Sequence, residues 1–415
     1  MKLHDIANIL KDFKNLRDPA MSRKDYMAEL KGCVKSYYDY NDDLASYLIE
    51  FFSPKELIEF LEANEQPRPM TIRTNTLKTR RRELSQNLMQ RGVGIDVLGD
   101  WTKVALKITS SKVPIGATPE YLGGHYIIQS ASSLLPVMAL APRPGERVLD
   151  MSAAPGGKTS HIAQLMKNTG NLFANDISKD RLSAVKGNLF RMGVTNAVIT
   201  NYDGRKYQKL MSGFDRVLLD APCSGLGVIY KDFSVKRNRT LRDIKNNAHL
   251  QKELLLSAID CTNARSGTGG YIVYSTCSIS VEENEMVIEY ALKNRHVKIV
   301  ETGIEIAEPG LTKYKGKHFS SDMSKCARTY PHIHNMDGFF VAKLKKLENA
   351  LPENASKPHS AAKRPKIKKI KLPPEQQEEP VEESEEYRTK DEIPEEEVDE
   401  EYNKYFLKAD EVPDP

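Results

Sequence analysis

Hydrophobic positions recur at helical spacing through the first 63 residues of the chain. Leu44, Leu48 and Phe52 repeat every four residues, which is typical of a helix with one buried face. Residues 53–56 read Ser-Pro-Lys-Glu, an N-cap serine, a first-position proline and a glutamate in the order that starts many helices. We predict a helical region over residues 1–63 and assign no chemistry to it.

The pattern changes to short β-type runs between residues 64 and 126. Met70–Arg73 and Val104–Ile108 have the composition of strands, and a helical stretch lies between them. This order predicts a small α/β module, and we expect this module to bind RNA. A basic cluster in it could contact phosphates or could be a solvated helix start. The cluster consists of Lys78, Arg80, Arg81 and Arg82.

Strand and helix patterns alternate over residues 127–346. The predicted strands are residues 147–150, 171–176, 197–200, 214–220, 270–277 and 338–343. The predicted helices between them include residues 158–166, 181–192, 241–264 and 281–294. Such alternation predicts a Rossmann-like α/β fold with a parallel, doubly wound sheet. Ligands of these sheets bind at the carboxyl ends of the strands, where polar residues gather in this sequence.

The hydrophobic pattern fades after residue 346. Residues 347–415 are rich in proline, lysine and then glutamate, which predicts a disordered tail, basic first and acidic later. Residues 363–369 resemble a nuclear import signal. Residues 374–415 hold 18 acidic and four basic residues, so the other 373 residues carry about +18 of a total formal charge of +4. This excess favours a nucleic acid partner.

Composition narrows the class of protein further. No stretch approaches the roughly 20 apolar residues that a membrane span needs, and the amino terminus does not read as a signal peptide. We therefore expect a soluble intracellular protein without a membrane partner. The five cysteines are scattered without paired metal spacing, which favours neither a disulfide framework nor a metal site.

A glycine turn follows the first predicted strand of the large domain, where residues 149–159 read Leu-Asp-Met-Ser-Ala-Ala-Pro-Gly-Gly-Lys-Thr. A phosphate-binding P-loop would need glycine at position 152. The better interpretation is an S-adenosylmethionine loop, where small residues admit the methionine part and a helix amino terminus favours its carboxylate. The predicted contacts are Ser152, Ala153, Ala154, Pro155, Gly156, Gly157 and Lys158.

Two acidic residues follow the next two strands. Asp176 lies 19 residues beyond Gly157, close to the spacing of roughly 20 at which an acidic residue binds a nucleotide ribose. A helix N-cap is the alternative for Asp176. Asp203 is placed to accept a hydrogen bond from the adenine amino group, with an ordinary turn residue as the alternative.

Two cysteines, Cys223 and Cys277, end strand regions. Methylation of a nitrogen or a hydroxyl needs no thiol, whereas carbon 5 of a pyrimidine becomes nucleophilic only after a thiolate adds to carbon 6. The alternative for either cysteine is a buried small hydrophobe. We expect Asp220 to hydrogen-bond the ring nitrogen side of the base, with Lys158 orienting that carboxylate or the base.

At these residues the chain resembles the Nop/Sun family of RNA cytosine-5 methyltransferases. Five segments appear in the family's order, at residues 73–78, 154–159, 220–225, 276–278 and 337–340. The resemblance covers about residues 40 to 345 and implies an S-adenosylmethionine cofactor. It also implies nucleophilic attack by Cys277 and product release by Cys223. Cofactor or base contacts are implied for Asp176, Asp203 and Asp220.

Finer likeness points to the branch of this family that modifies large-subunit ribosomal RNA. It is carried by residues 60–65, 113–122, 249–256 and 334–338. The likeness implies pre-ribosomal particles as partners, a role in assembly of the large subunit, and a location in the nucleus and nucleolus.

Other functions stay open at this point. A DNA-type cytosine methyltransferase would attack with Cys223 and would leave Cys277 without a role. A nitrogen methyltransferase would need an aromatic residue after its proline pair, which residues 220–223 lack. The chain could also methylate another RNA, or act as a pre-ribosome assembly factor whose methyl transfer is dispensable.

Overall fold

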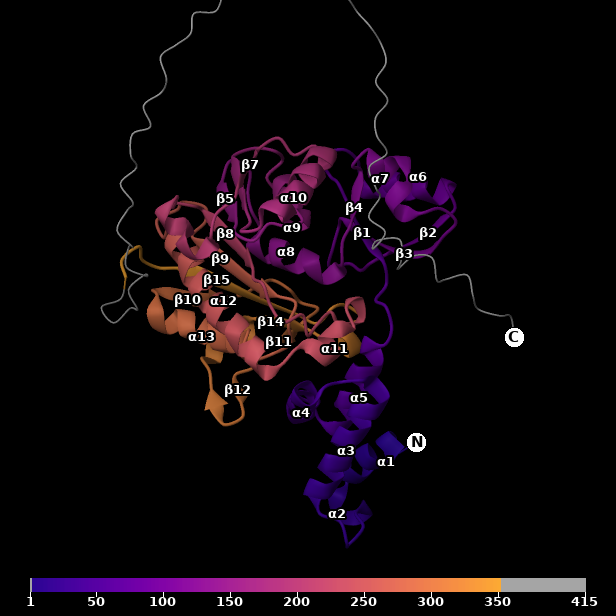
Figure 1. Ribbon diagram of the computed structural model, residues 1–415. Coiled ribbons are helices and arrows are strands. Elements are labelled where there is room, and N and C mark those ends of the chain that lie inside the picture. The colour runs from indigo at the N-terminus through magenta and orange to yellow at the C-terminus, as the bar shows by residue number, and fades with distance from the viewer. Residues whose placement is uncertain (1, 352–415) are drawn as a thin grey trace, which may run out of the picture. The chain divides into compact units, whose positions relative to one another are not determined.

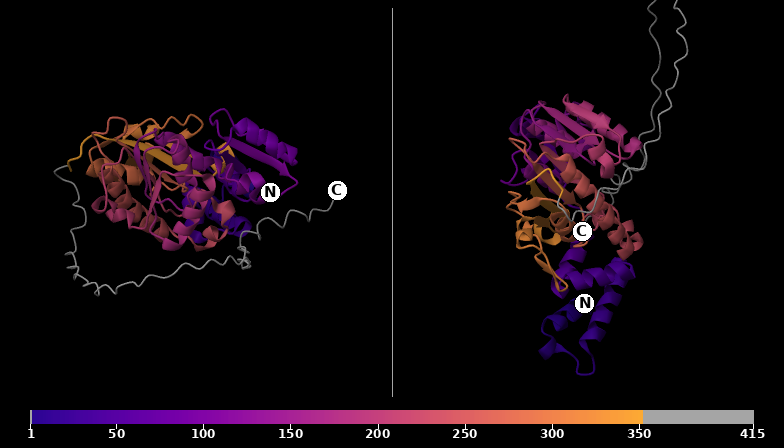
Figure 2. Two further views of the ribbon diagram at one scale, coloured as in Figure 1. Left: turned by 90° about the horizontal axis from the view of Figure 1, so that it is seen from above. Right: turned by 90° about the vertical axis from the view of Figure 1, so that its left-hand side faces the viewer.

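The computed structural model describes residues 2–351, and the predicted tail from residue 352 on lies outside the described residues. The amino-terminal helices are α1 (Lys2–Lys11), α2 (Phe13–Leu16), α3 (Arg23–Tyr38), α4 (Asp42–Phe51) and α5 (Pro54–Asn64). The hydroxyl of Ser53 accepts from the amide of Glu56, and Pro54 lies in the first turn, so the predicted start of α5 is confirmed. These helices pack against one another, and α1 contacts both α3 and α5. They are the indigo helices around the N label in the right-hand view of Figure 2.

The small α/β module follows the helices. Its elements are β1 (Thr71–Thr74), α6 (Arg81–Gln90), β2 (Val93–Val97), β3 (Ala105–Ser111), α7 (Pro119–Leu122) and β4 (Tyr126–Ile128). The strands form an antiparallel sheet in the order β2-β3-β1-β4. Leu84 and Leu88 of α6 are buried against this sheet in one cluster with Ile72. The predicted module is confirmed, whereas the division of the chain at residues 63 and 126 stays a prediction.

A second sheet forms the large domain. Its strands are β5 (Arg147–Asp150), β6 (Asn171–Asn175), β7 (Ala197–Thr200), β8 (Arg216–Asp220), β9 (Tyr271–Thr276), β10 (Val297–Val300), β11 (Glu308–Pro309), β14 (Ala327–Thr329) and β15 (Phe339–Lys346). Its helices are α8 (Leu135–Leu140), α9 (Gly157–Leu165), α10 (Lys179–Met192), α11 (Ser234–Asn238), α12 (Leu241–Cys261), α13 (Glu285–Asn294) and α14 (Pro331–His334). A short hairpin, β12 (Lys313–Tyr314) and β13 (Lys317–His318), stands outside this sheet.

The strand order confirms the Rossmann-like fold and corrects one part of it. β7, β6, β5, β8 and β9 are parallel neighbours. The strand predicted at residues 338–343 is β15, and it runs antiparallel to β9. β10 and β14 also pair antiparallel to β15. The prediction of an all-parallel sheet is therefore wrong at this edge, because a hydrophobic pattern reads the same in both strand directions.

Helices cover both faces of the sheet (Figure 1). On one face, Leu149, Val217 and Leu219 pack with residues of α12 and α13. On the other face, Val148 and Leu218 pack with residues of α8 and α9. Alternate residues of each central strand thus enter opposite cores, which explains why these strands read as almost continuous hydrophobic runs.

Candidate active site

Three strand ends meet where the strand order of the large sheet reverses. The chain leads outward from β5 to β6 and β7, and then returns to β8 on the other side of β5. Ligands of open α/β sheets bind at such a reversal, outside the carboxyl ends of the strands. The loops after β5, β8 and β9 reach this edge together because the three strands are parallel neighbours.

The predicted cofactor loop joins β5 to α9. Gly156 has a φ of 99°, which residues with a Cβ rarely adopt. A Cβ there would stand 3.3 Å from the Cα of Val185 in α10. The amide of Ala153 donates to the carbonyl of Asn175 at 2.7 Å. The loop is therefore held against β6 and α10. Its remaining members are Ser152, Ala154, Pro155 and Gly157, and α9 begins at Gly157.

Arg73 of β1 holds the same loop from the small module. Its fully buried guanidinium donates to the Gly157 carbonyl and the Ser160 hydroxyl, both at 2.6 Å, and to the Gln129 side chain at 2.5 Å. Burial lowers the pKa of Arg73 to about 9. From the sequence we predicted no separate role for Arg73. A role for Arg73 could have been inferred from its position, since it is an arginine within a strand whose other residues are apolar or small.

The two acids predicted to bind the cofactor have different surroundings. Asp176 is buried beside the loop and accepts from the amides of Ala154 and Ser178, at 3.1 and 3.0 Å. Asp203 caps a 3-10 helix and takes the guanidinium of Arg205 on both carboxylate oxygens. Hydrogen bonds from Arg205 lower the pKa of Asp203. The ribose and adenine contacts of these residues stay predictions.

The two cysteines lie face to face at the ends of β8 and β9. Their Sγ atoms are 3.1 Å apart, although 53 residues separate them in the chain. Both are half-buried, whereas the other cysteines, Cys33, Cys261 and Cys326, are buried. The hydrogen bond to Cys277 and burial raise the pKa of the Cys223 thiol well above its usual value. Cys223 therefore stays protonated at neutral pH and can donate to the Cys277 sulfur.

Asp220 and Lys158 form an ion pair beside the cysteines. Lys158 Nζ lies 2.7 Å from one oxygen of Asp220, and the hydroxyl of Ser275 donates to the other oxygen at 2.6 Å. Burial opposes the charge of Lys158, but the Asp220 carboxylate outweighs it, so the pKa of Lys158 is raised. Cys277 also acts on Lys158 electrostatically. Sequence reasoning missed Ser275, which β-strand alternation places on the same side as Cys277.

The basic cluster of the small module is partly used within the fold. Lys78 donates to the carbonyls of Gly123 and Arg191, and Arg81 donates to the carbonyl of Thr102. Arg80 and Arg82 are exposed. An RNA contact by this cluster stays a prediction.

Two features are absent from the described residues. Residues 2–351 contain no group of three or more His, Cys, Asp or Glu side chains arranged to hold a metal ion. Among the same residues, no helix has the length and apolar character of a membrane span.

Comparisons with known proteins bear on this geometry. Residues 137–345 match the family described as 16S rRNA methyltransferase RsmB/F, and residues 48–115 match its ferredoxin-like domain. The chain is 59% identical over 352 residues to the 28S rRNA (cytosine-C(5))-methyltransferase of Mus musculus. That match covers 85% of this chain and 44% of the mouse protein. The chain thus spans less than half the length of that relative.

Two solved structures from Pyrococcus horikoshii share the fold. A methyltransferase homolog protein has a TM-score of 0.69 at 38% identity, over 79% of this chain and all of the other. NSun6 with SFG, an S-adenosylmethionine analogue, has a TM-score of 0.67 at 26% identity, over 75% of this chain and 99% of the other. The chain therefore belongs to the RsmB/F methyltransferase family, and the family resemblance inferred from its motifs is confirmed.

Proposed function

We propose that the protein transfers a methyl group from S-adenosylmethionine to carbon 5 of a cytosine in large-subunit ribosomal RNA. The observation that carries this proposal is the pair of cysteine sulfurs, 3.1 Å apart beside the Asp220–Lys158 ion pair. Chemistry at carbon 5 of a pyrimidine needs one thiolate, which methylation of nitrogen or oxygen does not, and the second thiol can assist product release.

The residues around the β5–α9 loop fit the proposed cofactor. α9 begins at Gly157 behind the glycine N-cap Gly156, which has no capping side chain, so the first-turn amides can bind a carboxylate. Asp176 lies beside this loop with its carboxylate held by two amides. S-adenosylmethionine would supply an electrophilic methyl group here. Arg73 and Asn175 would keep the loop in place from the two sides.

The two cysteines and Asp220 have different roles in the proposed reaction. The Cys277 thiolate adds to carbon 6 of the cytosine, which makes carbon 5 nucleophilic toward the methyl group. Carbon 5 then loses its proton to solvent water, and the electron pair of that C–H bond re-forms the ring double bond and breaks the C6–S bond. Cys223 donates a hydrogen bond to the Cys277 sulfur and can return a proton to it as that bond breaks. Asp220, held by Lys158 and Ser275, is placed to stabilise charge on the nitrogen side of the ring.

The proposed RNA substrate and cellular location are supported by sequence likeness and not by the geometry of the site. The mouse relative is named for 28S rRNA, and the finer sequence likeness favours the same substrate class. We therefore infer large-subunit ribosomal RNA as substrate, pre-ribosomal particles as partners, and a nucleolar location with a role in assembly. The basic run at residues 363–369 is consistent with import into the nucleus.

A covalent trapping experiment tests both the chemistry and the substrate class. The Cys223→Ala variant should accumulate a covalent protein–RNA adduct on a denaturing gel, because the C6–S bond forms but product release is slowed. The Cys277→Ala variant should form no adduct, since it lacks the attacking sulfur.

Large-subunit ribosomal RNA serves as substrate in this experiment, and small-subunit ribosomal RNA of equal length serves as the matched control. An adduct with Cys277→Ala and none with Cys223→Ala would assign the attack to Cys223. Equal adducts with both RNAs would contradict the proposed substrate class.

A further inference from the structure

Each proposed catalytic cysteine is followed by a serine, and both serines contact the same carboxylate. The hydroxyl of Ser224 donates to Glu283 Oε2 at 2.5 Å, and its amide donates to Oε1 at 2.7 Å. The hydroxyl of Ser278 also donates to Oε2, at 2.5 Å. One side chain therefore connects the loop that carries Cys223 with the loop that carries Cys277.

The Glu283 carboxylate is fully buried and satisfied by neutral donors. Besides the two serines, it accepts from the hydroxyl of Ser280 at 2.8 Å and from the amide of Gln251 at 3.3 Å. Within residues 2–351 no lysine, arginine or histidine forms an ion pair with it. Five neutral donors converging on two oxygens stabilise a buried negative charge without a countercharge.

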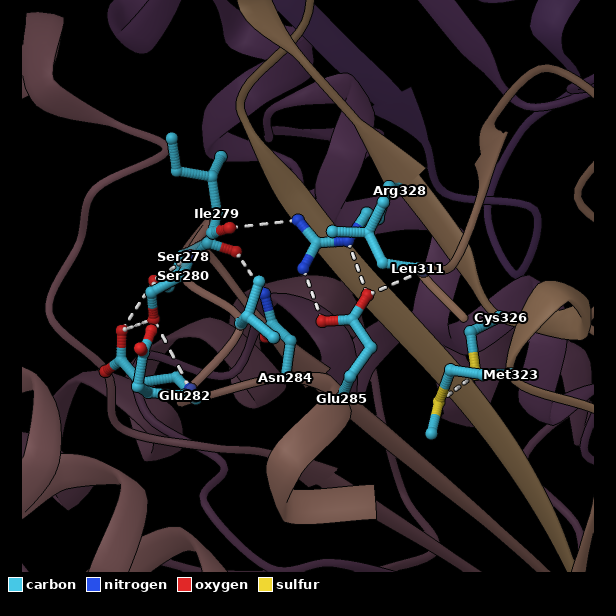
Figure 3. A network of polar contacts seen from close by, with 12 residues as sticks. Ser278, Ile279, Ser280, Glu282, Asn284, Glu285, Leu311, Met323, Cys326 and Arg328 are labelled. Atoms are coloured by element: carbon cyan, nitrogen blue, oxygen red, sulfur yellow. Dashed lines mark hydrogen bonds and ion pairs between the residues drawn. The ribbon is translucent and has the colours of Figure 1, made fainter. Parts of the chain in front are cut away.

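The segment that carries Glu283 also departs from the helix predicted there. The pattern predicted a helix from Val281, but α13 begins at Glu285, because the preceding residues turn to bring Glu283 onto the serines. Figure 3 shows the stretch from Ser278 to Glu285, with the neighbouring Glu285 bonded to Arg328. The two glutamates thus have different tasks. Glu285 pairs with an arginine, whereas Glu283 joins the two cysteine loops.

Resting on the proposed function, we propose that Glu283 is a positioning residue that holds the Cys223 and Cys277 loops at their working distance and sets the charge around Cys223. The charge acts on one of the two thiols in particular. After the hydrogen bond to Cys277 and burial, the charges of Cys277 and Glu283 also raise the pKa of Cys223. Glu283 thereby favours Cys223 as the hydrogen-bond donor in the sulfur pair.

Two substitutions of Glu283 distinguish the effect of side-chain length from the effect of negative charge. Glu283→Gln keeps the length of the side chain and removes its charge, whereas Glu283→Asp keeps the charge and shortens the reach. Both should lower kcat by roughly tenfold or more, because small displacements of reacting groups cost catalysis heavily, with little change in the KM for S-adenosylmethionine. Glu283→Gln should shift the pH midpoint of Cys223 alkylation by iodoacetamide to lower pH, and by more than Glu283→Asp, which keeps the negative charge.

The neighbouring Glu282→Gln is the matched control. Glu282 is half-buried and its carboxylate accepts from the hydroxyl of Tyr47 at 2.7 Å. This variant should retain kcat within about twofold and leave the alkylation midpoint of Cys223 unchanged. Alkylation is quantified by mass spectrometry of the peptides that contain Cys223 and Cys277.

The alkylation readout does not depend on methyl transfer. If the wild-type protein methylates no cytosine, the proposed function fails, while the midpoint shift can still be observed. If the wild-type protein methylates RNA and folded Glu283→Gln keeps its kcat and its midpoint, the positioning role is overturned. If Glu283→Gln does not fold, Ser224→Ala and Ser278→Ala replace it. Each should lower kcat, and wild-type kcat in both would overturn the proposal.

Discussion

At the scale of single residues, Asp150 is the most perturbed carboxyl group at the edge of the sheet. It ends β5, is fully buried, and accepts from the hydroxyl of Thr159 at 2.7 Å. Its second oxygen has no hydrogen-bond partner. Burial raises the pKa of Asp150 to about 7, with the charge of Asp220 acting in the same direction. The unfolded chain has the ordinary value near 3.8.

This raised pKa predicts how stability depends on pH. Between about pH 4 and pH 7 the folded state binds more protons at Asp150 than the unfolded state, so the free energy of unfolding falls as pH rises. Asp150→Asn removes the titration and keeps an acceptor for Thr159. Its stability relative to wild type should rise by roughly 2 to 3 kcal/mol between pH 5 and pH 8, as measured by urea unfolding at each pH. A constant difference would show that Asp150 does not titrate in this range.

At the scale of elements, Arg73 couples β1 of the small module to α9 of the large domain. Its guanidinium reaches the Gly157 carbonyl, where α9 begins. No carboxylate neutralises it among the groups that shift its pKa. Hydrogen bonds to neutral groups therefore stabilise this buried cation, and the same bonds set where the cofactor loop ends.

Arg73→Met should weaken both the fold and the proposed cofactor site. The apolar side chain fills the space but leaves Gly157, Ser160 and Gln129 without their donor, which costs about 2 to 4 kcal/mol. We expect a lower melting temperature and at least a tenfold weaker affinity for S-adenosylhomocysteine by titration calorimetry. The exposed Arg80→Met is the control and should change neither. Unchanged affinity in Arg73→Met would mean that β1 does not position the loop.

At the scale of the whole molecule, the amino-terminal helices and the catalytic loops share one core. Leu48 and Phe60 of the helices are buried in the same cluster as Leu226 and Ile279, which follow Cys223 and Cys277 closely in the chain. The hydroxyl of Tyr47 accepts from the amide of Val281, which lies between Cys277 and Glu283 in the chain. The helical region, to which the sequence pattern assigned no chemistry, therefore supports the loops that carry the cysteines.

The net charge of the whole chain gives a prediction at this scale. Removing residues 374–415 takes away 18 acidic and four basic residues and changes the formal charge from +4 to about +18. The shortened protein should bind unspecific RNA at least tenfold more tightly at 50 mM salt, because RNA affinity depends on released counterions. The difference should shrink as salt is raised. Fluorescence anisotropy measures the RNA affinity of each protein. The control for chain length is a variant in which a neutral segment of equal length replaces residues 374–415, and it should also bind RNA tightly.

Much of the candidate site was predictable from neighbours along the chain. The cap at Ser53, the glycine turn at Gly156 and the cysteines at strand ends depend on backbone conformation within a few residues, which local sequence encodes. The family motifs then implied roles for Cys277 and Cys223. The start of α13 was misplaced because Val281 and the residues after it have a helical pattern, whereas the tertiary contacts of Glu283 impose a turn.

The type of fold, the order of its elements and the kinds of chemical group at the strand ends could be predicted from the sequence alone. Which of those groups meet became visible only in the folded chain. Four features depend on residues that are far apart in the chain. They are the direction of β15, the distance between the two sulfurs, the bonds from Arg73 to α9, and the shared contact of Ser224 and Ser278 with Glu283. Such contacts depend on strand pairing and burial, which no local pattern specifies.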